Sequence, residues 1–139
     1  MKKLFLWIVL AIACLNAKSN PSVAVSDFER YSQQMSDLSS KYIADKQFEN
    51  ASKVIDIWLA SYEKTTVSEK VACNQIYATI LYNQACAYAQ TNELFKALKA
   101  LNESVKKGYS NKAQLENDVN LLPLKLFDEY KMILKKMKS

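Results

Sequence analysis

Apolar side chains recur at intervals of three and four residues along most of the chain, the spacing that places them on one face of an α-helix. The first stripe predicts a helix over residues 27–44, opened by a capping box from Ser26 to Glu29. A second stripe begins at Phe48 and predicts a helix of about four turns. Because the break between them is short, we expect the two helices to pack antiparallel. The stripes consist of Phe28, Tyr31, Met35, Leu38 and Tyr42, then Phe48, Ala51, Val54, Ile55, Trp58, Leu59 and Tyr62.

A second capping box, from Thr66 to Glu69, predicts a long helix that reaches about Gln90. This helix is apolar on more than one face, which is typical of a central helix that is contacted on several sides. The next stripe runs from Leu94 to Val105 and ends at Gly108, the only glycine of the chain, where a helix end favours a left-handed residue.

The remaining sequence predicts a short and a longer helical element. Ser110 is expected to cap a turn over residues 111–117, and a last helix is expected to begin between Pro123 and Asp128. One side of that last helix is apolar and the opposite side is rich in lysine. The apolar side carries Phe127, Tyr130, Leu134 and Met137, and the basic side carries Lys131, Lys135, Lys136 and Lys138.

The composition supports an all-α fold and excludes one class of partner. One glycine and two prolines in 139 residues favour helices, because helices exclude both residues and hairpin turns use glycine heavily. The formal net charge is +5, and it falls to +3 when residues 1–17 are left out, because Lys2 and Lys3 go with them. An excess this small and scattered does not provide the concentrated basic face that nucleic-acid binding needs.

The first residues have the layout of a secretory signal. Two lysines precede 12 apolar residues, Leu4 to Leu15, a run shorter than the roughly 20 that span a bilayer. Cleavage after Ala17 predicts a soluble periplasmic or secreted protein, whereas the loose lipobox that ends at Cys14 predicts a lipid-anchored one. We therefore divide the chain into a signal over 1–17 (or a lipoprotein signal ending before Cys14), a linker over 18–26 and one domain over 27–139.

The two helical units can be laid over each other. Every matched position is offset by 46 residues, about a dozen more than the 34 of a plain repeat of two short helices. The matched residues are Leu38, Tyr42, Phe48, Ala51 and Ile55 in the first unit and Gln84, Tyr88, Leu94, Ala97 and Leu101 in the second.

The second unit, Leu81 to Leu98, resembles a tetratricopeptide (TPR) repeat, with Ala85, Tyr88 and Ala97 at the small, aromatic and small signature positions. Gly108 to Ser110 and the segments that follow it look like the closing segment found after the last repeat in many bacterial members. These segments are Leu115 to Asp118, Leu121 to Leu124, Tyr130 and Leu134. The resemblance implies antiparallel hairpins stacked as a short TPR-like solenoid with a C-terminal capping helix.

In the family, the first helix of each repeat lines a groove that holds a peptide or a partner helix. The resemblance therefore implies a protein or peptide partner and a groove formed by two helices. An asparagine such as Asn83 can bond both backbone groups of an extended ligand. The groove residues it implies are Gln33, Ser36, Asp37 and Ser40 from the first unit and Thr79, Tyr82, Asn83, Cys86 and Gln90 from the second.

Catalytic chemistry has little support in the sequence. The chain has no histidine, which removes the commonest general base and the commonest metal ligand, and a single glycine cannot form a phosphate-binding loop. Cys73 and Cys86 lie 13 residues apart on one expected helix, too far apart to form a disulfide with each other, and we interpret both as buried packing residues. We expect a non-enzymatic protein without a cofactor or a metal.

Two alternatives to the groove remain open. The basic C-terminal helix can lie on an anionic membrane, as part of a structural lipoprotein. Alternatively, the domain acts as an adaptor in a larger envelope assembly, and binds through its convex or terminal surface.

Overall fold

The computed structural model describes residues 25–137, which form seven α-helices and one 3-10 helix and contain no strand. The prediction of an all-α fold is confirmed for this part of the chain. The elements are α1 (Asp27–Ala44), α2 (Phe48–Glu63), α3 (Val67–Ala72), α4 (Asn74–Gln90), α5 (Leu94–Lys106), α6 (Lys112–Asn117), η1 (Val119–Leu124) and α7 (Asp128–Lys136).

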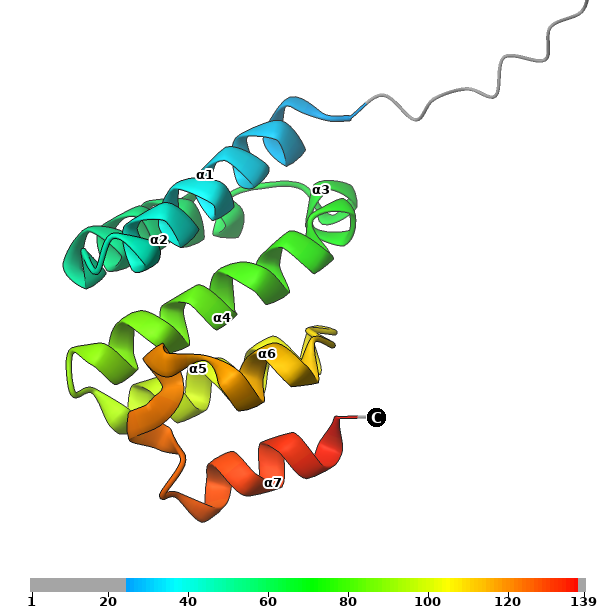
Figure 1. The fold of residues 1–139 in the computed structure, drawn as a ribbon. Coiled ribbons are helices and arrows are strands. Elements are labelled where there is room, and N and C mark those ends of the chain that lie inside the picture. The colour runs from blue at the N-terminus through cyan, green and yellow to red at the C-terminus, as the bar shows by residue number, and fades with distance from the viewer. Residues whose placement is uncertain (1–24, 138–139) are drawn as a thin grey trace, which may run out of the picture.

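The helices are stacked in layers, with α1 and α2 at one end, α4 in the middle and α7 at the other end (Figure 1). The central helix is α4, which packs against α1 and α2 on one side and against α5 and η1 on the others. Ten of its 17 residues are buried, because its apolar and small side chains meet neighbours on several sides. The expectation of a central helix at this place is confirmed.

Buried side chains form two clusters. The larger one joins α4, α5 and the C-terminal segment, and contains Leu101, Leu115, Leu121 and Leu124, all fully buried. The smaller one lies between the α1–α2 hairpin and α4, and is built around Trp58, whose ring packs against those of Tyr62 and Tyr77. Burial of these large side chains is the main favourable term in the stability of such a stack.

The most deeply buried face of α1 is lined by serines and not by the large apolar side chains of the predicted stripe. Ser32 and Ser39 have no exposed surface, whereas Leu38 is 37% exposed. Small side chains let α1 approach its neighbours closely, and their hydroxyls are satisfied: Ser32 donates to the Phe28 carbonyl oxygen at 2.7 Å. The other apolar residues of the predicted stripe are partly buried: Tyr42 packs against the larger cluster, and Phe28, Tyr31 and Met35 pack against the smaller one.

The long helix predicted from Thr66 to Gln90 is interrupted at Cys73. The Thr66 capping box is present, but α3 ends at Ala72 and α4 begins at Asn74, at an angle to α3 (Figure 1). Cys73 has ψ 5°, away from helical values, and is held by contacts on both sides of the bend. Its thiol lies 3.6 Å from Ser32 Oγ, and the neighbouring Asn74 side chain donates to the Lys107 carbonyl oxygen at 2.9 Å. As a result, Val67 and Val71 of α3 are exposed, whereas a central helix over the whole range from Thr66 to Gln90 would have buried them.

From the end of α5 onward, some of the observed helix boundaries agree with the predicted ones and others differ. Gly108 has φ 105°, as predicted for a left-handed helix end. The cap of α6 is Asn111 and not Ser110, because the Asn111 side chain accepts the Gln114 amide at 3.0 Å. Pro123 lies inside η1, and α7 begins at Asp128, one end of the range predicted for its start.

Candidate functional site

The groove residues predicted on α1 lie mainly on its surface. Gln33, Asp37 and Ser40 are exposed, and the Gln33 amide donates to the Asp37 carboxylate at 2.8 Å. Ser36 is buried and directs its carbonyl oxygen toward α4. The exposed part of this set is therefore polar: Gln33 and Asp37 are bonded to each other within α1, and Ser40 is bonded to α4.

Asn83 connects two helices. Its side-chain nitrogen lies 2.9 Å from the hydroxyl oxygens of both Ser39 and Ser40 on α1, and its side chain is 5% exposed. In this conformation the Asn83 amide binds its own chain, and the two backbone groups of an extended ligand have no access to it.

Tyr82 and Cys86 meet the C-terminal segment. The Tyr82 hydroxyl donates to Asp118, and the Tyr82 ring stacks on Tyr109 with 4.6 Å between centroids. The Cys86 sulfur lies 3.7 Å from Asp118 Oδ2. The Asp118 carboxylate also accepts the Asn120 amide at 2.8 Å, so that one acidic group links α4 to η1.

The two ends of the predicted set on α4 are bonded within the chain as well. Gln90 donates to the Asn120 carbonyl oxygen at 2.9 Å. Thr79 donates to the Gln75 carbonyl oxygen of its own helix at 3.3 Å. Of the α4 part of the predicted groove, Asn83 is thus covered by α1, and Tyr82 and Cys86 are covered by the C-terminal segment. The structure does not bring all nine residues to one open surface.

Burial also changes the acidity of the Cys86 thiol and the Tyr82 hydroxyl. It raises the pKa of the Cys86 thiol well above its ordinary value, and the nearby Asp118 carboxylate adds to the shift. Burial likewise raises the pKa of Tyr82. Because a thiolate, and not a thiol, is the reactive nucleophile, Cys86 stays a protonated packing residue at neutral pH.

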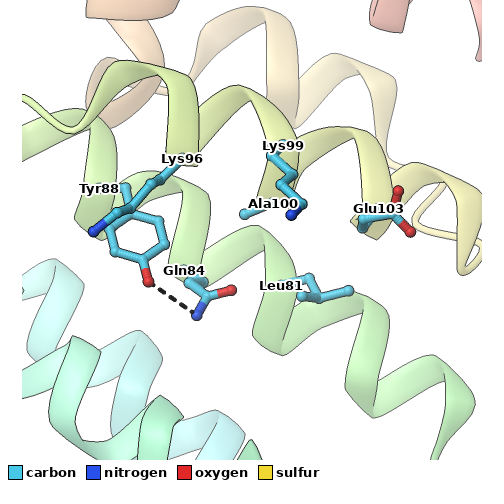
Figure 2. A pocket seen from close by; sticks show the side chains of 7 residues that line it. All are labelled: Leu81, Gln84, Tyr88, Lys96, Lys99, Ala100 and Glu103. Carbon is cyan, nitrogen blue, oxygen red and sulfur yellow. Dashed lines mark hydrogen bonds between the residues drawn. The ribbon is translucent and has the colours of Figure 1, made fainter.

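A different opening lies between α4 and α5, and the sequence analysis did not identify it as a site. It is a groove of about 370 Å³ whose lining is mostly apolar. Gln84 and Tyr88 of α4 and Lys99 of α5 supply polar groups to it (Figure 2). One signal was present in the sequence: Gln84 occupies a position where the first unit has Leu38. The full lining is Leu81, Gln84, Tyr88, Lys96, Lys99, Ala100 and Glu103.

The remaining features bear on metals, thiols and membranes. Within residues 25–137, no three His, Cys, Asp or Glu side chains converge on a point where a metal ion could bind. Cys73 and Cys86 are both buried free thiols, as the sequence analysis predicted. Among the described helices, none is both long enough and apolar enough to span a bilayer.

The C-terminal helix presents its apolar side to the rest of the protein. Tyr130, Ile133 and Met137 are buried, while Lys131, Lys135 and Lys136 are exposed. In this conformation the apolar face that the membrane alternative requires packs against the core. The proposed signal over 1–17, Cys14 and most of the linker over 18–26 lie outside the described residues.

Comparison of the chain with protein-family models, with curated proteins and with solved structures finds no match.

Proposed function

We propose that this chain is a non-enzymatic module that binds a protein or peptide, built as a short TPR-like solenoid of two hairpins and a closing segment. On the basis of its N-terminal residues, we further propose that it acts in the bacterial cell envelope, either as a soluble exported protein or through a lipid anchor at Cys14.

The observation that supports this proposal is a pair of turns that match at an offset of 46 residues. Lys46 has φ 57° after α1, and Asn92 has φ 64° after α4. In the first turn the Gln47 amide donates to the Tyr42 carbonyl oxygen at 2.8 Å, and in the second the Glu93 amide donates to Tyr88, also at 2.8 Å. Left-handed residues other than glycine are uncommon, so their recurrence at equivalent places favours a true structural repeat.

Burial follows the same offset at four of the five matched positions and differs only between Leu38 and Gln84. Ala51 and Ala97 are both without exposed surface, and Ile55 and Leu101 are 1% and 0% exposed. Small residues at such positions let two helices of a hairpin come close together, and the following large residue fills the core. Repeat proteins of this kind stack units that cannot bury their faces alone, and their surfaces commonly serve as binding surfaces.

The surface carries apolar side chains that are suited to a partner. Val67 and Val71 are 80% and 72% exposed on α3, and Phe95 and Leu126 are 79% and 88% exposed at other positions. Single exposed apolar residues are common in folded proteins, but neighbouring pairs at helical spacing such as Val67 and Val71 favour contact with another protein.

Affinity capture with the natively processed protein tests this proposal, followed by reconstitution with each purified candidate partner. We expect one protein to bind stoichiometrically and to elute with the bait as a single complex in size-exclusion chromatography. An Asp37→Ala variant separates the predicted α1 surface from other binding surfaces, because Asp37 is exposed and, within the described residues, its side chain bonds only Gln33 of its own helix. A bait that returns without any stoichiometric partner contradicts the proposal.

A further inference from the structure

The groove between α4 and α5 contains a buried polar side chain whose bonding capacity is largely unused. Gln84 is 9% exposed, and its only hydrogen bond within the described residues joins Nε2 to the Tyr88 hydroxyl at 3.5 Å. That distance is long for a hydrogen bond of this kind. The Oε1 atom has no partner in the described part of the chain, and the carboxamide faces the groove (Figure 2).

An apolar residue would be the ordinary choice for such a position. The equivalent residue of the first hairpin is Leu38. Every fully buried side-chain oxygen or nitrogen among the described residues has a hydrogen-bond partner, so the unbonded Gln84 Oε1 atom is open to the groove. A carboxamide with a free acceptor and a weakly engaged donor has the chemistry to bind a peptide backbone, whose N–H and C=O it can bond together.

The charges around the groove leave one cation available. Lys96 pairs with Glu93, and Glu103 pairs with Lys106 at 2.7 Å. Within residues 25–137, Lys99 has no carboxylate at ion-pair distance, and it lies over the groove beside Ala100 (Figure 2). A ligand carboxylate therefore fits best at Lys99. Burial raises the pKa of Tyr88, and the nearby Asp56 carboxylate of α2 adds to the shift, so the Tyr88 end is less suited to an anion.

We propose that this groove binds an extended segment of a partner protein in which an acidic side chain lies next to apolar ones. This inference rests on the proposed function and names the site and the chemistry of the partner. The Gln84 carboxamide bonds the peptide backbone, and the Lys99 ammonium binds the acidic side chain. Leu81 and Ala100 pack against the apolar side chains, and the groove volume of about 370 Å³ is within the range of small-ligand sites.

Selection from a random heptapeptide library against the natively processed protein tests the inference. We expect enrichment of peptides that place Asp or Glu beside an apolar residue. The Kd of the most enriched peptide, measured by fluorescence anisotropy, should rise at least about tenfold in Lys99→Gln and in Gln84→Leu, because each variant removes a direct bond. A Lys53→Gln variant serves as the control: Lys53 is exposed on α2 and does not line the groove, so its Kd should stay within about twofold.

Two results overturn the inference: a library that yields no acidic and apolar motif, or a Kd that is unchanged in both groove variants. Because Lys99 is exposed, Lys99→Gln remains informative even if circular dichroism shows that Gln84→Leu has altered the fold. The groove inference can also fail while the proposed function stands. If both groove variants capture the natural partner as well as the wild type does, the groove is not the binding site, but the protein remains an interaction module.

Discussion

The indole nitrogen of Trp58 on α2 donates a hydrogen bond to the hydroxyl oxygen of Ser32 on α1, over 2.9 Å, and neither side chain has exposed surface. Ser32 in turn donates to the Phe28 carbonyl oxygen, so that both polar groups are satisfied in the interior. This pair joins the two helices of the first hairpin, and the Cys73 thiol approaches the same oxygen from the α3–α4 bend.

Ser32→Ala should lower the free energy of unfolding by about 1–3 kcal/mol, because it leaves the buried indole N–H of Trp58 without an acceptor. Urea unfolding followed by circular dichroism measures the change. Ser61→Ala is the matched control: Ser61 bonds only the Ile57 carbonyl oxygen on the outside of α2, so its loss should cost less than about 0.5 kcal/mol. Equal midpoints for the two variants would contradict the role given to Ser32.

Asn83→Ala should also destabilise the fold, by about 1–3 kcal/mol, because it removes the amide that joins α4 to Ser39 and Ser40. Asn50→Ala removes an exposed amide that bonds only Gln47, and is expected to be nearly neutral. Thermal unfolding of both variants compares them. If Asn83→Ala keeps wild-type stability but loses the partner, Asn83 is a ligand-binding residue, as the sequence analysis first proposed.

The stability of the folded chain should fall as the pH rises from about 10 to 12. Burial raises the pKa of Tyr109 to about 12, whereas an unfolded tyrosine ionises near its ordinary value of about 10. In that interval the folded state keeps a proton that the unfolded state releases, so the stability present below pH 10 is progressively lost. Tyr82 shifts in the same direction.

Urea midpoints measured at pH 8 and at pH 11 test this dependence. In Tyr109→Phe the difference between the two midpoints should be smaller than in the wild type, because one of the buried titrating groups is gone. The variant also loses the hydrogen bond from the Tyr109 hydroxyl to Gln114 at 2.7 Å. Its midpoint at pH 11 is therefore compared with its own midpoint at pH 8 and not with that of the wild type. An unchanged difference would show that Tyr109 does not carry the effect.

Gly108→Ala should cost about 1 kcal/mol through the backbone alone. A methyl group at this position would meet only the Gln75 side chain at 3.8 Å, so space is not limiting, but φ 105° is unfavourable for alanine. Lys46→Gly makes the opposite change at φ 57° and should be neutral or stabilising. Thermal unfolding distinguishes the two directions, and a stabilising Gly108→Ala would refute the backbone argument.

Helix positions were the most predictable part of the fold, because apolar spacing and capping residues act locally. The start of α1 at Asp27 and the left-handed Gly108 follow from neighbouring residues alone. The bend at Cys73 does not, because it depends on Ser32 and Lys107, which are distant in sequence. The serine-lined face of α1 was missed for a similar reason: its closest partners lie on other helices, and hydropathy alone ranks Leu38 above Ser39.

The candidate site was harder to predict than the fold. The family resemblance placed Tyr82, Cys86 and Gln90 together in a groove, and the structure places all three near the C-terminal segment. That segment covers this side of the helix with Asp118 and Asn120, a contact that no local pattern encodes. Gln84 was visible as a polar residue at an apolar position, but only the arrangement of α4 and α5 shows that it faces a groove.

The most direct test of the interaction role is isothermal titration of the natively processed protein with the partner recovered by affinity capture. We predict saturable binding at a one-to-one ratio, weakened by Lys99→Gln in the groove between α4 and α5 and unchanged by Lys53→Gln on α2. If no captured protein gives saturable binding to the folded chain, the interaction role is contradicted and the hairpin stack must serve another purpose.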